Sequence, residues 1–282
     1  MTPADRRLAQ VTEGAGAAVR GLHVLLVAYG DPELPAQALT ALAAPTGSVT
    51  VVDNGRDPRV EEMAARHGAA YVLPESNLGF AAGVNLGLGR TAREDVLLLN
   101  PDARFAWEQG RSMQASFLDD PRLAAVAPML VRPDGSQERP SWPLPSPGQV
   151  WRDALALERF GRSPHFLTGA VLMLRREALD ELGGLDERYF LYAEEADWQL
   201  SALRAGWRIR LREDLSAVHL GGATSSDSAV RHRHFTESGR SFARKWYGPW
   251  GVASMAVGSR VAVLRRSAVA RAGRRAPTSE RT

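Results

Sequence analysis

The sequence contains no cysteine, which excludes disulfides, thiolate metal sites and cysteine nucleophiles. Long hydrophobic runs are absent too, because no window approaches the roughly 18 uncharged apolar residues of a membrane-spanning helix. The nearest stretch, residues 250–264, is short and contains Arg260. Residues 1–20 mix charged side chains with alanine and glycine and lack the continuous apolar core of a secretory signal. We expect them to form a disordered leader.

Two glycine-rich nucleotide-binding signatures are also missing. The first expected strand spans residues 23–28, and the turn after it reads Tyr-Gly-Asp-Pro rather than G-x-G-x-x-G. The sequence also contains no phosphate-loop lysine motif. This absence argues against a dinucleotide-dependent dehydrogenase. The same turn lacks the Arg/Lys-containing glycine loop of nucleotidyltransferases that make sugar nucleotides, which leaves that class as a weaker alternative.

The formal net charge of +3 is unevenly distributed. Residues 260–282 contain seven arginines and one glutamate, a local charge of +6, so the remainder of the chain carries −3. This distribution argues against a nucleic-acid partner and predicts a basic C-terminal tail over residues 249–282. Aromatic residues just before it favour a membrane interface, and arginines attract anionic lipid. We expect peripheral contact with an anionic membrane; a solvated tail that only aids solubility is the alternative.

The order of apolar segments predicts an α/β fold. Short buried strands alternate with helical patterns, which indicates a mostly parallel central sheet with helices on both faces. The expected strands in the first part of the chain are residues 23–28, 49–53, 71–73 and 96–100. After residue 102 the alternation loosens into a strand at 123–130, a proline-rich loop at 139–148, an apolar return at 166–174, and helices near 176–182 and 194–205. We expect one domain over residues 21–248, with a nucleotide-binding half at about 21–103 and an acceptor half at about 104–248.

Acidic and amide side chains follow two of the expected strands. Asp53 and Asn54 come after Val-Thr-Val-Val, and Asp102 follows Val-Leu-Leu-Leu-Asn-Pro. Ligands bind outside the carboxyl ends of strands in open α/β sheets, and a carboxylate there can hold a divalent cation that grips phosphates. These positions predict a nucleotide site. The alternative role is turn formation or helix capping, which Asp and Asn perform widely.

A glycine-containing loop and an acidic helix add two candidate elements. Gly79 and Gly83 allow backbone to approach a ligand closely, and the helix after them directs its amides at an anion; a tight loop packed by small residues is the alternative. Glu194, Glu195 and Asp197 open a helix after an aromatic run. Acidic residues commonly complement a helix dipole, but burial and mutual repulsion would raise one pKa and create a general base.

Taken in order, these motifs resemble the family 2 glycosyltransferases, in particular the rhamnosyltransferase-like branch, over about residues 22–248. The matching segments are 52–55, 77–85, 99–102, 168–170, 183–192, the acidic helix and 219–222. The resemblance implies a GT-A fold with a smaller acceptor-side lobe. It also implies inverting transfer of a sugar from a nucleoside diphosphate donor, with Mg²⁺ or Mn²⁺ as cofactor.

The resemblance implies donor-binding roles for five residues. Asp53, with Asn54, would contact the donor nucleoside. Asn77, Gly79 and Asn85 would shape the pocket for the ribose and diphosphate.

The same resemblance implies roles for four further residues, two in metal binding and two beside the sugar and acceptor. Asp102 matches the last carboxylate of the family's DXD-type metal motif, and His219 matches a second metal ligand of some members. A lone histidine after a strand is more often structural. Thr168 and Gly169 would line the junction between sugar and acceptor.

Two positions depart from the family pattern. Asn100 replaces the first acid of the DXD motif, and Glu195 stands where the catalytic base, usually Asp, is expected. One extra methylene displaces a carboxylate by about an ångström, which can cost roughly a hundredfold in rate if nothing compensates. Asp197 is the fallback base.

The branch often uses dTDP-L-rhamnose, which is therefore the first expected donor, with UDP-sugars close behind. The expected acceptor is a glycan or polyprenyl-diphosphate-linked sugar in bacterial cell-envelope polysaccharide synthesis, and a secondary metabolite is an alternative. The expected location is cytoplasmic, at the inner face of the plasma membrane. A non-catalytic glycosyltransferase-like binding subunit is the rival that the Glu195 change supports.

Overall fold

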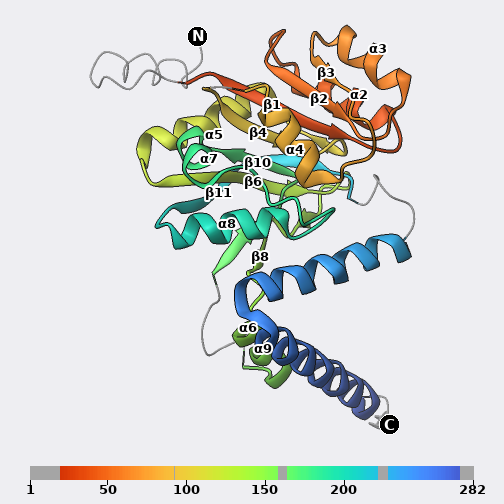
Figure 1. Cartoon of the computed structure of the whole chain (residues 1–282), viewed down its shortest axis with the longest axis vertical. Helices are drawn as coiled ribbons and strands as arrows, with labels where there is room; N and C mark the ends of the chain where they lie inside the picture. Colours follow the sequence, from red (N-terminus) through yellow and green to blue (C-terminus); the bar gives the residue numbers. More distant parts are fainter. Residues whose placement is uncertain (1–19, 92, 158–163, 222–227, 274–282) are drawn as a thin grey trace, which may run out of the picture. The chain divides into compact units, whose positions relative to one another are not determined.

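The computed structural model describes residues 20–91, 93–157, 164–221 and 228–273 (Figure 1). The expected leader lies outside these residues except for Arg20. The chain forms two compact units, the first from residues up to 142 together with 166–238, and the second from 143–165 together with 239–282. This division differs from the expected boundary at 248/249, because residues 143–165 and 239–248 group with the C-terminal segment.

The first unit is built on a nine-stranded sheet of order β3-β2-β1-β4-β10-β6-β11-β5, with β7 beside β6. The strands are β1 (Leu22–Ala28), β2 (Val49–Asp53), β3 (Ala70–Val72), β4 (Asp95–Leu99), β5 (Ala103–Arg104), β6 (Leu123–Val131), β7 (Gln137–Glu138), β10 (Val171–Leu174) and β11 (Arg208–His219). Two further strands, β8 (Ser141–Pro143) and β9 (His165–Leu167), pair with each other.

One strand in the middle of the sheet, β10, runs opposite to both its neighbours, and β5 and β7 are antiparallel to β11 and β6. The β3-β2-β1-β4 half is parallel, as the sequence predicts, and β11 runs parallel to β6. Strand β10 is antiparallel to both β4 and β6. The parallel half therefore delivers the carboxyl ends of β1, β2 and β4 to one edge, where ligands bind in open α/β sheets.

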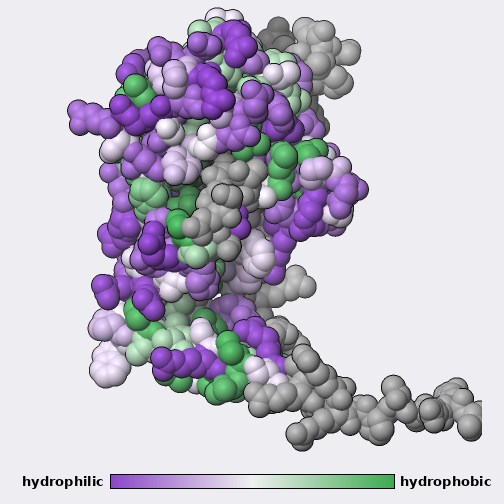
Figure 2. Space-filling model, turned by 90° about the vertical axis from the view of Figure 1, so that its right-hand side faces the viewer, coloured by the Kyte–Doolittle hydropathy of each residue, from purple (hydrophilic) through white to green (hydrophobic). Residues whose placement is uncertain are grey.

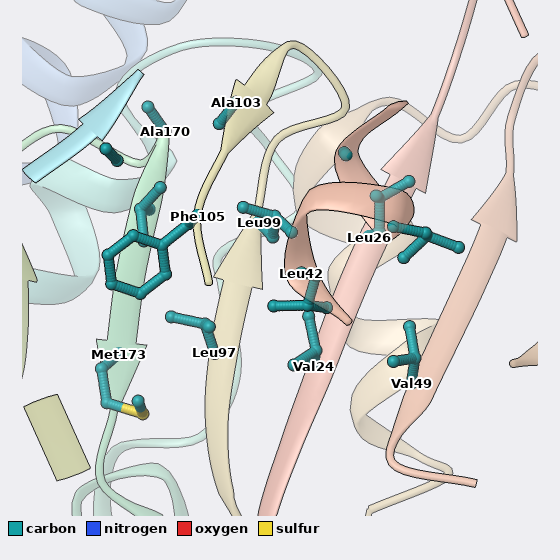
Figure 3. Packing of buried hydrophobic residues seen from close by; sticks show 14 of the residues in the cluster. Val24, Leu26, Leu42, Val49, Leu97, Leu99, Ala103, Phe105, Ala170 and Met173 are labelled. Carbon is teal, nitrogen blue, oxygen red and sulfur yellow. The ribbon is translucent and has the colours of Figure 1, made fainter. Parts of the chain in front are cut away.

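Helices cover both faces of the sheet, which confirms the expected α/β layering. One core cluster joins the sheet to α2 (Glu33–Leu42), α3 (Pro58–Arg66) and α5 (Trp107–Asp119). The other joins it to α4 (Phe80–Leu88), α7 (Arg176–Leu182) and α8 (Glu194–Arg204). Successive side chains of a strand alternate between faces, so Val24 and Leu26 enter the first cluster and Leu25 and Val27 the second. Figure 3 shows the first cluster, with Leu97 and Leu99 beside Val24 and Leu26.

The second unit consists of α6 (Pro147–Leu155) and the part of α9 (Ser228–Gly273) that follows residue 238. Ser146 caps α6 by accepting from the Gln149 amide, and Pro147 occupies the first turn, where its missing N–H leaves no helical hydrogen bond unmade. Helix α9 is two helices in succession, because Gly248 has a non-helical φ of 65° and Pro249 follows it. Within the residues that the structure describes, no helix combines the length and apolarity needed to span a bilayer.

Candidate active site

Two cavities, each of about 170 Å³, lie in the first unit and share Phe80, Asn100 and Leu191 in their walls. The strand-end cavity is also lined by Val27, Tyr29, Asn54, Asn77, Gly79, Pro101, Phe190, Val230, Arg231 and His234. The carboxylate cavity is also lined by Leu130, Glu138, Arg139, Trp142, Thr168, Gly169, Ala170, Tyr192, Glu194, Glu195 and His219. The structure thus brings together most of the candidate residues, which the sequence spreads over about 165 positions from Asn54 to His219.

The loop before α4 forms one wall of the strand-end cavity, and Gly79 fixes its shape. Gly79 has φ 81° and ψ −178°, a conformation that is essentially restricted to glycine. A Cβ at this position would also collide with the Phe190 carbonyl oxygen, which accepts a hydrogen bond from the Phe80 amide at 2.8 Å. The Asn54 Nδ2 donates to the Gly79 carbonyl at 2.7 Å, and the Asn77 Oδ1 accepts from the Gly79 amide at 2.9 Å. Both asparagines therefore line the cavity and hold its wall.

Three of the residues expected to bind the donor or its metal, Asp53, Asn85 and Asp102, line neither cavity. Asp53 is fully buried, and its two carboxylate oxygens accept from the amides of residues 55, 56 and 57 and from the Tyr71 hydroxyl. Asn85 exchanges hydrogen bonds with the backbone of Leu185 and donates to Glu187. Asp53 thus stabilises the turn after β2, and Asn85 ties α4 to the segment after α7.

Strand pairing brings Asp102, His219 and Glu138 together. Strand β11 pairs with β5 so that His219 lies opposite Ala103, and the Leu220 amide donates to the Asp102 carbonyl at 3.0 Å. Strand β7 pairs with β6 next to β11. As a result, His219 Nδ1 lies 2.9 Å from Glu138 Oε2, and His219 Nε2 lies 3.4 Å from Asp102 Oδ1.

This arrangement has the properties of a partial cation site. Asp102 is buried, and its Oδ1 has no hydrogen-bond partner among the described residues. Burial alone would lower the pKa of His219, but Asp102 and Glu138 outweigh burial and raise it. The described residues contain no cluster of three or more His, Asp or Glu side chains suited to a metal. One carboxylate oxygen and one imidazole nitrogen fit a cation that takes its other ligands from substrate phosphates and water, as Mg²⁺ commonly does.

Two neighbouring carboxyl groups, the buried Glu194 and the partly buried Glu195, form another part of the wall of the carboxylate cavity. Tyr192 and Ala193, at φ 70° and 73°, turn the chain into α8, so that Glu194 and Glu195 both line the cavity. Burial raises the pKa of both groups, and the charge of Glu195 raises the pKa of Glu194 further. A hydrogen bond between the two side chains raises the pKa of Glu194 and lowers that of Glu195, so Glu194 is the member of the pair that binds a proton more tightly. A carboxylate with a raised pKa is suited to accept a proton near neutral pH.

Asp197 lies one turn further along the buried side of α8. Its Oδ1 accepts a hydrogen bond from the buried Tyr189 hydroxyl at 3.0 Å, and burial together with Asp197 raises the pKa of Tyr189. Asp197 does not line either cavity. Of the two candidate bases, the structure therefore brings only Glu195 to the site. Gly169 lies beside it, since a Cβ there would be 3.8 Å from the Glu195 side chain.

The cavities contain residues that sequence reasoning missed. Glu138 orients His219, and only its place just before the proline-rich loop could have indicated it. That loop contributes Arg139, whose guanidinium lies 4.3 Å from the centre of the Trp142 ring. The first part of α9 contributes Arg231 and His234 to the strand-end cavity, and the His234 ring stacks on Phe190 with centroids 4.9 Å apart.

Comparison with known proteins relates this arrangement to characterised relatives. No protein-family model matches the chain. The chain is 31% identical over 223 residues to N-acetylglucosaminyl-diphospho-decaprenol L-rhamnosyltransferase of Mycobacterium tuberculosis, covering 66% of this chain and 71% of that protein. It is 24% identical over 208 residues to the low-salt glycan biosynthesis hexosyltransferase Agl10 of Haloferax volcanii, covering 70% and 66%.

A solved structure supports the same relationship at the level of the fold. The mannosyltransferase PcManGT from Pyrobaculum calidifontis, in complex with GDP-Man and Mn²⁺, superposes with a TM-score of 0.57 at 18% identity, over 95% of this chain and 86% of that chain. The fold is therefore that of the GT-A glycosyltransferases. The chain belongs to the family 2 glycosyltransferases, in their rhamnosyltransferase-like branch.

Proposed function

We propose that the protein is a metal-dependent, inverting glycosyltransferase that moves a sugar from a nucleoside diphosphate donor to a hydroxyl of a lipid-linked glycan. The first proposed donor is dTDP-L-rhamnose, and the proposed acceptor is a polyprenyl-diphosphate-linked sugar of bacterial cell-envelope synthesis. The name of the Mycobacterium tuberculosis relative supports both choices. The observation that carries the reaction class is that a base-like carboxylate, Glu195, and His219 line one cavity, with the buried Asp102 facing His219 from behind its wall.

The strand-end cavity is the proposed donor site. Asn54, Asn77 and Gly79 would surround the nucleoside and diphosphate from the strand side. The stacked rings of Phe190 and His234 provide an aromatic wall for a pyrimidine base, since aromatic faces stack on bases. The Arg231 guanidinium lines the same cavity and would pair with a phosphate, which arginine recognises well.

Asp102 and His219 are the proposed holders of Mg²⁺ or Mn²⁺. The orphaned Asp102 Oδ1 and the facing His219 Nε2 fit such an ion, and the PcManGT complex contains Mn²⁺. A bound cation would neutralise charge that develops on the departing diphosphate. Glu138 would keep the His219 ring oriented, because it faces the other ring nitrogen.

Glu195 is the proposed general base, with Thr168 and Gly169 beside the reacting groups. The acceptor hydroxyl gives its proton to the Glu195 carboxylate as its oxygen forms a bond to the anomeric carbon. The bond from that carbon to the diphosphate oxygen breaks at the same time, and its electron pair leaves with the diphosphate. Attack from the opposite face inverts the anomeric configuration. Glu194, whose pKa is raised the more of the two, would hold a proton and keep Glu195 ionised until this step.

Turnover by paired variants tests this function. We expect Asp102→Ala and Glu195→Gln each to lose at least about a hundredfold in rate when the chain is assayed with a panel of dTDP-, UDP- and GDP-sugars and a polyprenyl-diphosphate-linked acceptor. An exposed acid that lines neither cavity serves as the control, and its variant Asp134→Asn should keep normal turnover. Undiminished transfer by both site variants would overturn the assignment.

The glutamate at position 195 also favours a second candidate, a non-catalytic subunit that binds nucleotide sugar. Slow hydrolysis of the donor without acceptor distinguishes the two, since a pure binder releases no free sugar. A secondary-metabolite acceptor is distinguished by offering both acceptor classes to the same preparation. The proposed location is the cytoplasmic face of the plasma membrane, where a polyprenyl-linked acceptor would be accessible.

A further inference from the structure

The second helical part of α9 has one side packed within its own unit. Trp151 of α6 donates from Nε1 to the Ser254 hydroxyl at 3.0 Å. A Cβ on Gly258 would meet Val150 of α6, and Arg265 donates to the Asp153 carbonyl at 3.1 Å. Positions 254, 258 and 265 recur at the spacing of one helix face. This inner face of α9 is therefore covered by α6.

A different side of the same helix exposes large apolar residues. Trp250, Val257 and Leu264 follow each other at seven-residue spacing, about two helical turns, and are 87%, 49% and 69% exposed. Val263 is 54% exposed. We call Trp250, Val257, Val263 and Leu264, together with the exposed Arg260 among them, the outer face of α9. Figure 2 shows hydrophobic residues beside hydrophilic ones on the part of the chain that contains α6 and this part of α9.

The charge around the outer face has one sign. Residues 239–273 contain six arginines and one lysine and no aspartate or glutamate. Arg260 lies between Val257 and Leu264 and is exposed, as is Arg266, two residues after Leu264. An apolar stripe with arginines along it and an exposed tryptophan at one end matches the chemistry of an anionic lipid surface. Apolar side chains enter the acyl boundary, tryptophan lies at the headgroups, and arginine extends its charge to anionic headgroups.

We propose that the outer face of α9 docks on the surface of an anionic bilayer. A second copy of the chain is the competing occupant, but a symmetric pairing of this face around Arg260 would bring like charges together. An anionic bilayer instead neutralises Arg260 and Arg266 with its headgroups, and the acyl boundary of the same bilayer covers the apolar stripe. The surface is argued from the second unit alone. Docking would keep the protein beside a lipid-linked acceptor, and this role rests on the proposed function.

Vesicle co-sedimentation of the full chain tests the proposal. The chain is mixed with vesicles of phosphatidylcholine alone or of phosphatidylcholine with phosphatidylglycerol. We expect pelleting with the anionic vesicles, a roughly tenfold weaker partition for Leu264→Asp and a roughly fivefold weaker partition for Arg260→Gln. The matched control is Leu73→Asp, which places the same charge on a 50% exposed leucine of the first unit and should bind vesicles as the unaltered chain does.

Each outcome bears on the proposal. The proposal is overturned if Leu264→Asp and Leu73→Asp pellet equally with the anionic vesicles. It is also overturned if pelleting of the unaltered chain does not depend on phosphatidylglycerol. A doubling of mass in light scattering that Leu264→Asp abolishes, without vesicle binding, assigns the face to a second copy and also overturns it. A glycosyl-transfer assay with a water-soluble acceptor analogue distinguishes a failure of this proposal from a failure of the proposed function. We expect Leu264→Asp to keep normal transfer to that analogue. If the proposed function fails, Asp102→Ala will show undiminished turnover while the unaltered chain still binds vesicles.

Discussion

His219 lies between two carboxylates, with Nε2 3.4 Å from Asp102 Oδ1 and Nδ1 2.9 Å from Glu138 Oε2. Glu138 therefore acts on the proposed cation site through the imidazole and does not itself face the cation. Partners of this kind fix the tautomer and orientation of a ligating histidine. The raised pKa of His219 has the same cause, since both carboxylates favour the protonated ring against the effect of burial.

Glu138→Gln is expected to raise the Mn²⁺ concentration needed for half-maximal activity by about tenfold to a hundredfold. The rate at saturating Mn²⁺ should stay close to normal, because the substituted amide still occupies the same position beside the ring. A metal titration of initial rates checks this, with Asp134→Asn as the control. A loss of maximal rate with an unchanged metal requirement would contradict a positioning role.

The Glu194–Glu195 pair predicts a pH dependence with a defined sign. The pKa of Glu195 is raised by burial, and a base is active only above its pKa. The acid limb of kcat/KM should therefore lie above the range of an ordinary carboxyl group, and activity should fall as pH decreases through it. Glu194→Gln keeps a donor to Glu195, so the limb should stay in place. Glu194→Leu removes that donor, so the pKa of Glu195 should rise and the limb should move to higher pH.

The pH–rate profiles of these two variants are compared with that of the unaltered chain. A limb that moves equally in Glu194→Gln and Glu194→Leu would show that the donated hydrogen bond is not what keeps Glu195 ionised. A limb in the ordinary carboxyl range would remove Glu195 as the base.

Arg231 lines the strand-end cavity, and its charge is expected to contribute to donor binding. Arg231→Ala should weaken the binding of UDP or dTDP by about tenfold or more, because a hydrogen bond between charged groups is lost. Calorimetric titration measures this. Arg233, which is exposed and lines neither cavity, provides the control substitution Arg233→Ala. Equal losses in the two variants would indicate only a general effect of surface charge.

Two glycines with the same φ of 81° separate backbone strain from steric collision. At Gly47 a Cβ meets nothing within 4 Å, whereas at Gly79 it collides with the Phe190 carbonyl oxygen. We expect Gly47→Ala to lower the free energy of unfolding by about 1–2 kcal/mol. Gly79→Ala should lower it by at least about 1 kcal/mol more, because the backbone must move. Urea denaturation measures both, and equal losses would contradict the close contact between residues 79 and 190.

The sequence predicts the parallel half of the fold well because its signals are local. The strand expected at residues 49–53 has these bounds in the structure, since a β-branched run followed by Asp-Asn-Gly marks its end. The strand expected at residues 96–100 is displaced by one residue, to Asp95–Leu99. The reversed direction of β10 was not predictable, because an apolar run reads the same in either orientation and only its neighbours in the sheet decide.

The sequence does not show which candidate side chains are already engaged by distant partners. Asp53 follows a strand as a ligand-binding acid would, but Tyr71 and three local amides use both of its oxygens. Asn85 is similarly used by Leu185, which is 100 positions away. Such partners depend on packing between elements, which the sequence pattern does not reveal. The contacts of His219 with Glu138 and of Phe190 with His234 were missed for the same reason.

The binding of a nucleoside diphosphate with and without Mn²⁺ tests the central claim most directly, namely that Asp102 and His219 grip the donor through a cation. UDP and dTDP are titrated into the full chain and into Asp102→Ala, each in Mn²⁺ and in EDTA. The account predicts at least about tenfold tighter binding in Mn²⁺ for the unaltered chain and no such difference for Asp102→Ala. Equal affinities in Mn²⁺ and EDTA for the unaltered chain, or an Mn²⁺ effect that persists in Asp102→Ala, would contradict it.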